Sequence, residues 1–372
     1  MRTIGRGAVG RAAVAALVGV VLVATGCGSK SSSTTGASGT AGGPSGKVAL
    51  LLPENKTARY ESQDRPLFTA RLKSLCPGCD LLYSNADQDA NKQLSQADAA
   101  LTNGAKVLVV DPVDASAAAG IVQKAKARGV GVISYDRLIA NADVDYYISF
   151  DNIRVGQLQG QALVDRLMQL GTIDKGQIVM INGSPTDSNA KPFKQGAHSA
   201  IDGKVRVGKE YDTKEWLAPE AQREMDESIT ALGKNSIVGV YAANDPMAAG
   251  AIAALKAAGF DPLPPVTGQD AELAGIQRIL DGEQYMTVYK AVKPEAERAA
   301  ELAISLLGGN STPPTTTGTM NNGKKDVPSI ILTPVAVTKS SIKDTVVKDG
   351  FWSTTQICTA QYVNACKAAG LL

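Results

Sequence analysis

Short apolar runs that end on polar residues recur along the chain. Each precedes a cluster of Asp, Asn, Arg or Lys, and the runs span residues 107–110, 131–134, 146–150, 178–181, 237–243, 266–267 and 286–289. Between most of them lies an amphipathic stretch of helical length. This alternation is typical of a parallel sheet with crossover helices, in which polar groups collect just beyond the carboxyl ends of the strands. We therefore expect the chemistry of the chain to lie in one crevice at that edge.

The alternation occurs twice. The first series begins at the strand 47–52 and ends at the strand 146–150, and the second runs from the helix 155–170 to the strand 285–289. This repetition predicts two doubly wound parallel-sheet α/β lobes with a cleft between their carboxyl-end faces. The chain continues with a helix at 293–307, a polar loop at 308–326 and an extended segment at 330–337. Because a helix and a strand follow the completed second series, we expect the chain to return to the first lobe and cross again. Three crossings between the lobes would form a three-strand hinge.

Length and charge narrow the class of protein. A chain of 372 residues can bury one large core or two ordinary ones. Its apolar share of 44% and charged share of 20% are those of a soluble globular protein. Without Arg2, Arg6 and Arg11, which belong to a removable leader, 35 basic residues face 36 acidic ones. A near-neutral chain without a basic stripe argues against nucleic-acid binding.

Residues 1–27 are typical of a bacterial lipoprotein signal. Three arginines precede the apolar run 12–24, which is too short to span a membrane comfortably and ends on small residues before Cys27. In such signals the cysteine is lipidated and becomes the mature N-terminus; an ordinary secretory leader is the alternative. Residues 28–46 are almost all Ser, Thr, Gly and Ala and suit a flexible tether. We expect a domain held at the outer face of the cell membrane by lipid alone.

Four further cysteines predict two disulfides, because an even number outside the cytoplasm is typical of disulfide bonding. Three pairings are possible, and closeness in sequence favours Cys76–Cys79 with Cys358–Cys366. A redox role for the first pair is disfavoured, since its CPGC motif follows a helix-like run instead of opening one. Zinc is disfavoured because the chain has a single histidine, His198, and no second CxxC motif.

Motifs of enzymes and cofactor sites are missing from the sequence. There is no nucleophile elbow, no phosphate loop after a strand and no G-x-G-x-x-G after a strand. His198 lies in a predicted helix at 192–201 and is interpreted as a solvated helix residue. The segment 85–91 resembles a calcium loop, but it lacks the sixth-position glycine, and Asp87 fits a helix N-cap better. We therefore expect no catalytic residue, no metal and no cofactor.

What remains is a set of hydrogen-bonding side chains with two aromatic rings, mostly at strand ends. The candidates are Arg59, Tyr60, Asp136, Arg137, Asp187, Asn189, Trp216, Asn244, Asp270 and Lys290. Such a set suits a neutral sugar, because each hydroxyl donates and accepts and can be bridged by Asp, Asn and Arg. The apolar face of a pyranose packs on a flat ring such as that of Trp216.

Each candidate also has a purely structural interpretation. Asp136 and Arg137 could form a surface ion pair, Asn244 and Asp270 could cap helices, Trp216 could belong to the core, and Lys290 could be a solvated strand end. Convergence on one face of one architecture favours the binding interpretation for the set as a whole.

Several segments resemble the D-xylose-binding proteins of bacterial sugar ABC transporters, over about residues 47–351. They read YDRLI (135–139), YISFDN (147–152), GSPTDSNAK (183–191), AND (243–245), GQDAELAGI (268–276), MTVYK (286–290), NNG (321–323) and KDTVVKDGF (343–351). The resemblance implies a type I periplasmic-binding-protein fold with a three-strand hinge. It implies an N-terminal lobe of 47–151 plus about 291–326, and a C-terminal lobe of 152–290 plus about 327–372.

Carried over by motif, the sugar contacts of these proteins fall on nine of the ten candidates, and Tyr60 marks a departure. Their Arg-Trp in the first loop is Arg59-Tyr60 here, with one extra residue before Asp64, so that the ring is smaller and carries a hydroxyl. The choice of residue within each cluster rests on this resemblance.

The resemblance implies a monomeric, non-enzymatic receptor that captures a monosaccharide, D-xylose first, by hinge closure. It would deliver the sugar to an ABC permease with a cytoplasmic ATPase. The sequence leaves open another aldose (glucose, ribose or arabinose) and a lipoprotein that presents its sugar to a membrane signalling receptor. A surface glycosidase is a further alternative. It would need two carboxylates flanking the scissile bond in an open groove, whereas the candidate residues mix Arg, Lys and Asn with Asp. A transcription regulator with the same lobes is excluded by the leader and the absent helix-turn-helix.

Overall fold

The computed structural model describes residues 45–308 and 314–372. The predicted leader with Cys27, and the tether up to residue 44, lie outside the described residues. The tether's predicted end at 46 is one residue too long, because Gly46 already pairs with Cys79 at the start of β1. No helix in the described ranges has the length and apolar character needed to cross a membrane.

The first lobe is a seven-stranded sheet in the order β10-β11-β5-β4-β3-β1-β2. Its strands are β1 (Gly46–Leu52), β2 (Cys79–Asn85), β3 (Ala105–Val110), β4 (Gly131–Tyr135), β5 (Tyr146–Phe150), β10 (Gly318–Asn321) and β11 (Asp326–Leu332). All neighbours are parallel except β10 and β11. Because side chains alternate along a strand, Val48 and Leu50 enter one apolar cluster and Ala49 and Leu51 the other.

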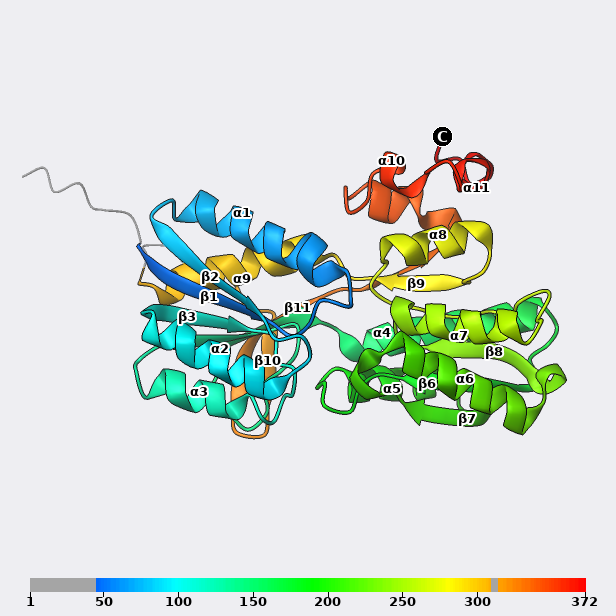
Figure 1. The fold of residues 1–372 in the computed structure, drawn as a ribbon, viewed down its shortest axis with the longest axis horizontal. Helices are drawn as coiled ribbons and strands as arrows, with labels where there is room; N and C mark the ends of the chain where they lie inside the picture. The colour runs from blue at the N-terminus through cyan, green and yellow to red at the C-terminus, as the bar shows by residue number, and fades with distance from the viewer. Residues whose placement is uncertain (1–44, 309–313) are drawn as a thin grey trace, which may run out of the picture. The chain divides into compact units, whose positions relative to one another are not determined.

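Helices cover both faces of this sheet (Figure 1). The helices are η1 (Tyr60–Asp64), α1 (Arg65–Leu75), α2 (Ala90–Thr102), α3 (Ala119–Lys126) and α9 (Val292–Leu306). Phe68 of α1 and Ala299 of α9 belong to the cluster of Val48, whereas Ala97 of α2 and Ile121 of α3 belong to that of Ala49. The helix α9 comes late in the sequence, so the first lobe is completed only after the chain has built most of the second.

The second lobe has a parallel sheet β7-β6-β8 and an antiparallel pair β12-β9. Its strands are β6 (Gln177–Asn182), β7 (Arg206–Asp212), β8 (Ile237–Ala242), β9 (Met286–Tyr289) and β12 (Val335–Thr338). Its helices are α4 (Asn152–Gln169), α5 (Ala190–Ile201), η2 (Lys214–Trp216), α6 (Ala218–Leu232), η3 (Lys234–Ser236), α7 (Asp245–Ala257) and α8 (Leu273–Asp281). The helices α4 and α5 touch backbone to backbone, since a Cβ on Gly156 would lie 1.9 Å from the Phe193 carbonyl oxygen.

The C-terminal segment packs against α8 and β9. It comprises η4 (Lys339–Ser341), η5 (Lys343–Val347), α10 (Thr354–Ile357) and α11 (Val363–Ala368). Val346 and Trp352 share an apolar cluster with Ile276 and Tyr289. The predicted disulfides Cys76–Cys79 and Cys358–Cys366 are both confirmed.

The chain crosses between the lobes three times, as predicted: after β5, after β9 and after β11. The position of the third crossing differs from the prediction. The resemblance implies that residues from about 327 onward belong to the second lobe, whereas β11 (Asp326–Leu332) pairs with β5 in the first sheet. The chain therefore crosses after Leu332.

Three local predictions are wrong. The polar loop 308–326 contains β10, a short exposed edge strand whose Thr and Asn side chains hid it. The apolar run 266–267, expected to be a strand, makes only an isolated bridge between Val266 and Val240. The second helix begins at Ala90, and its N-cap is Asp89, which accepts from the backbone of Asn91 and Lys92; Asp87 is not the cap.

Candidate functional site

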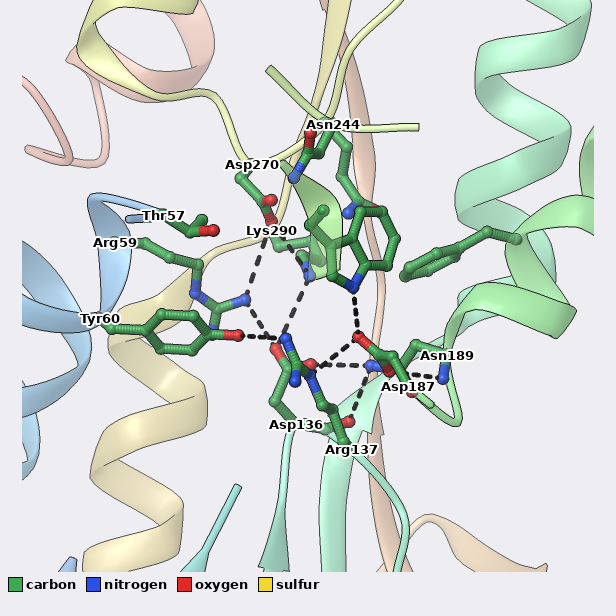
Figure 2. Close-up of a pocket in the computed structure, with 13 residues that line it drawn as sticks. Thr57, Arg59, Tyr60, Asp136, Arg137, Asp187, Asn189, Asn244, Asp270 and Lys290 are labelled. Atoms are coloured by element: carbon green, nitrogen blue, oxygen red, sulfur yellow. Dashed lines mark hydrogen bonds and ion pairs between the residues drawn. The ribbon is translucent and has the colours of Figure 1, made fainter. Parts of the chain in front are cut away.

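One pocket gathers all ten predicted residues (Figure 2). Its lining consists of Thr57, Arg59, Tyr60, Asp136, Arg137, Asp187, Asn189, Phe193, Trp216, Asn244, Gln269, Asp270 and Lys290. The first five come from the first lobe and the others from the second. All of the charged side chains in this lining are at least 90% buried.

The sequence prediction missed Thr57, Phe193 and Gln269. Thr57 and Gln269 stand beside predicted residues in the same strand-end loops, so proximity along the chain was an available signal. Phe193 lies in a predicted helix, where an apolar residue is ordinarily interpreted as core. It is indeed buried, and its ring meets that of Trp216 edge to face at 6.2 Å between centroids.

Three lining residues have a left-handed backbone, which is unusual for residues other than glycine. The φ angles are 55° at Asp136, 58° at Trp216 and 87° at Asp270. Such a conformation costs of order 1–3 kcal/mol and persists only where the surroundings impose it. Backbone hydrogen bonds impose it here, from Asp136 N to Ile148 O at 2.8 Å and from Asp270 N to Val288 O at 2.8 Å. Strain concentrated at one pocket indicates a functional site.

Arg59 is fixed by carboxylates of its own lobe. Its Nε and Nη2 donate to both oxygens of Asp64 at 3.0 and 2.7 Å, and Nη2 also donates to Glu295 at 3.0 Å. The Tyr135 hydroxyl completes the cluster by donating to Asp64 at 2.5 Å. Because Nε and Nη2 are held in this way, the remaining nitrogen, Nη1, donates to Asp136 at 2.6 Å.

Asp136 lies where cations of both lobes meet. Lys290 Nζ from the second lobe is 3.6 Å from Asp136 and 3.1 Å from Asp270. Burial alone would raise the pKa of Asp136, but Lys290 and Arg59 together hold it well below its ordinary value. Burial likewise works against the Lys290 charge, and Asp136 and Asp270 nevertheless raise the pKa of that amine. Asp136 and Lys290 are therefore charged at neutral pH, despite complete burial.

Arg137 bridges the lobes in a similar way. Its Nε lies 2.8 Å from Asp187 of the second lobe, and its Nη2 donates to the Tyr60 hydroxyl at 3.2 Å. Asp187 also accepts from Trp216 Nε1 at 3.2 Å. Burial raises the pKa of Asp187 in spite of the Arg137 charge. A single carboxylate thereby orients a guanidinium and an indole at the pocket wall.

The ring of Trp216 lies directly on the backbone of Gly183. A Cβ at position 183 would lie 2.0–2.6 Å from three ring atoms, so only glycine allows this packing. Trp216 belongs to η2 beyond β7, and Gly183 follows β6. The two neighbouring strand ends thus fix the flat apolar wall of the pocket.

The purely structural interpretations are wrong for the Asp136–Arg137 pair, Lys290 and Asp270, and correct for Asn244. Asp136 and Arg137 are buried, so they are not a surface pair, and Lys290 is only 4% exposed, so it is not solvated. Asp270 does not cap α8, whose N-cap is Glu272. Asn244 does cap α7, since its side chain accepts from Met247 N at 2.9 Å, and it lines the pocket as well.

The sequence raised two other kinds of site outside the pocket, one at the histidine and one for a metal ion. His198 is half-buried on α5 and pairs with Asp202 and Glu210 on the surface of the lobe. Within residues 45–308 and 314–372, no group of three or more His, Cys, Asp or Glu side chains could hold a metal ion. The pocket presents donors and acceptors of both signs beside apolar rings, which suits a neutral ligand with many hydroxyls.

Comparison with protein families and curated proteins gives a consistent result. Residues 48–311 match the model of the periplasmic binding protein domain. The chain is 40% identical over 310 residues to the D-xylose-binding periplasmic protein of Escherichia coli K12, which covers 82% of this chain and 90% of that protein. It is 34% identical to the multiple sugar-binding periplasmic receptor ChvE of Rhizobium radiobacter, over 84% of this chain and 92% of that one.

Solved structures show the same fold. An ABC transporter solute-binding protein of Clostridium phytofermentans with bound β-D-glucose superposes with a TM-score of 0.78 at 29% identity, covering 84% of this chain and 99% of that one. A carbohydrate transporter solute-binding protein of Chloroflexus aurantiacus in complex with D-glucose gives 0.71 at 30% identity, covering 84% and 98%.

Proposed function

Because the chain belongs to the periplasmic binding protein family, we propose that it is an extracytoplasmic receptor that encloses one monosaccharide and delivers it to an ABC importer. One observation carries the proposal: a single buried pocket, lined from both lobes by Asp, Asn, Arg and Lys around aromatic rings. A ligand in this pocket touches both lobes. It therefore favours the closed arrangement by its differential affinity for that state, which is how hinge closure is driven.

The ten predicted residues are the proposed sugar contacts. Asp136 and Asp270 accept from sugar hydroxyls, and Lys290 and Arg137 donate to them. The Asn244 side chain uses its oxygen as a helix cap, which leaves its amide NH₂ for the ligand. A sugar lacking one hydroxyl would leave a buried group unpaired, and this penalty gives selectivity.

D-xylose is the proposed ligand, on the strength of the xylose-binding relatives. Glucose is the second candidate, because the two solved relatives at about 30% identity carry glucose. Tyr60 supports glucose as the second candidate, since a phenol ring is smaller than the indole that the xylose-binding motif has at this place. The smaller ring leaves space for the hydroxymethyl group that glucose has and xylose lacks.

Calorimetry of the purified protein against D-xylose, D-glucose, D-ribose and L-arabinose tests the proposal. We expect binding near 1 μM, which corresponds to about −8 kcal/mol, for xylose or glucose. Asp270→Ala should abolish it without unfolding the protein. Absence of binding to every aldose, or an unchanged affinity in the variant, would refute the proposed site.

We also propose that Cys27 carries the lipid anchor, as the leader pattern indicates. Cell fractionation of a Cys27→Ser variant checks this, and the variant should leave the membrane fraction. A variant that stays in the membrane would count against the anchor.

A further inference from the structure

The lobes are also joined by hydrogen bonds between residues outside the pocket lining. Leu138 N donates to Ser188 Oγ at 2.8 Å, and Ala115 N donates to Thr186 O at 3.0 Å. A third bond runs from Ala58 N of the first lobe to Glu272 Oε1 of the second at 2.8 Å. Neither Ala58 nor Glu272 lines the pocket.

The Ala58–Glu272 bond joins the two segments that carry site residues. Ala58 stands between Thr57 and Arg59, and Glu272 follows Asp270 by two positions. The loop on the first lobe is already braced, because Glu54 accepts from Thr57 N at 3.0 Å. The bond therefore joins a braced loop of the first lobe to the loop that carries Asp270.

Glu272 lies among other charged groups of the second lobe. Asp245 accepts from the Glu272 backbone N at 2.9 Å, Asp270 belongs to the same loop, and Arg278 extends from α8 to the Asp245 carbonyl oxygen at 2.7 Å. Burial and then Asp245 raise the pKa of Glu272 to about 8. Burial likewise raises the pKa of Asp245 to about 7, so the two neighbouring carboxyl groups are not both charged at neutral pH.

We propose that Glu272 is an interlobe latch, which stabilises the closed arrangement through Ala58 and thereby sets sugar affinity without touching the sugar. This inference rests on the proposed function, since it assigns to one residue a part of the closure that the sugar drives. A protonated carboxyl still accepts from Ala58 N through its carbonyl oxygen, so the latch holds in the neutral form.

The test compares Glu272→Ala and Glu272→Gln with the unmodified protein. The glutamine variant keeps an acceptor for Ala58 N and has no charge to repel Asp245, whereas the alanine variant keeps neither. We expect Glu272→Ala to bind sugar about tenfold more weakly, through faster dissociation, as the loss of one such bond implies. Glu272→Gln should bind sugar as tightly as the unmodified protein, because its amide oxygen still accepts from Ala58 N. Glu227→Ala, which removes an exposed acid of α6, is the matched control and should change nothing.

Two outcomes would overturn the latch: unchanged affinity and dissociation rate in Glu272→Ala, or a loss of affinity in Glu272→Gln as large as that in Glu272→Ala. Small-angle scattering of the sugar-free protein provides a readout that is independent of sugar binding. Glu272→Ala should give a larger radius of gyration than Glu272→Gln, and equal radii would also refute the proposal. If the unmodified protein binds no aldose at all, the proposed function fails, and the scattering comparison still decides whether the latch exists.

Discussion

The two lobes supply the pocket with similar polar groups but hold them in different ways. In the first lobe, charge holds them: Arg59 is fixed by Asp64 and Glu295, which are buried carboxylates of the same lobe. In the second lobe, Asp270 pairs with Lys290, but the backbone holds two other groups: Trp216 lies on Gly183, and Asn244 is fixed as the cap of α7. The first lobe thus depends on charge balance, and the ring wall and the amide of the second lobe depend on local chain geometry.

This difference determines which substitutions each lobe can tolerate. A charge removed from the first lobe leaves its partners buried and unpaired, so the damage extends beyond the pocket into the fold. A changed backbone position in the second lobe displaces one wall and leaves the rest of the core intact. Sugar binding and folding stability should therefore both fall steeply in the first lobe, whereas in the second lobe a large loss of binding should accompany a smaller loss of stability.

Arg59→Met gives the largest expected effect. It keeps the apolar length of the side chain but leaves Asp64, Asp136 and Glu295 without their shared cation. Removing one partner of a buried ion pair costs about 3–5 kcal/mol, so the free energy of unfolding should fall by that amount and sugar binding should disappear. Urea denaturation and calorimetry measure the two effects.

Arg65→Met is the matched control, because Arg65 pairs with Glu61 on the surface of the same segment, with both side chains more than a third exposed. An exposed pair contributes about 0–1 kcal/mol, and the control should bind sugar normally. If both variants lost the same stability, the first lobe would not depend on the buried charges.

Gly183→Ala should have an intermediate effect. Its Cβ would overlap the ring of Trp216, so the ring must move. Overpacking of this kind lowers the free energy of unfolding by about 1–3 kcal/mol, and the displaced ring should weaken sugar binding roughly tenfold. Gly120→Ala is the control, since its nearest neighbour is a Leu94 methyl group at 3.8 Å. Unchanged affinity in Gly183→Ala would show that the ring wall is not needed.

Much of this organisation could be predicted from the sequence. The two lobes, the three crossings and the gathering of Asp136 and Asp270 in one pocket follow from strands that end on polar residues. These strands are buried on both faces, so their apolar runs are strong signals. The exposed edge strand β10 had no such run, and it was interpreted as a loop.

The supporting residues could not be predicted in the same way. Glu295 lies in a helix far along the chain, and nothing in its local pattern distinguishes it from a solvated glutamate. Its contact with Arg59 spans 236 positions in the sequence. Phe193 and Glu272 are similar cases, because a residue's role in holding or closing a pocket depends on tertiary contacts that local periodicity does not encode.

Asn244 gives the smallest expected change in stability and the clearest separation of folding from binding. Asn244→Asp keeps an oxygen that accepts from Met247 N but replaces the amide donor with a second acceptor. A carboxylate suits a helix N-terminus, so the free energy of unfolding should stay the same or rise by a few tenths of a kcal/mol, while sugar affinity falls sharply. Asn244→Ala loses the cap too and should be destabilised by about 1 kcal/mol. If the aspartate variant kept full affinity, the amide of Asn244 would not be a ligand donor, and the residue would serve only to hold its helix.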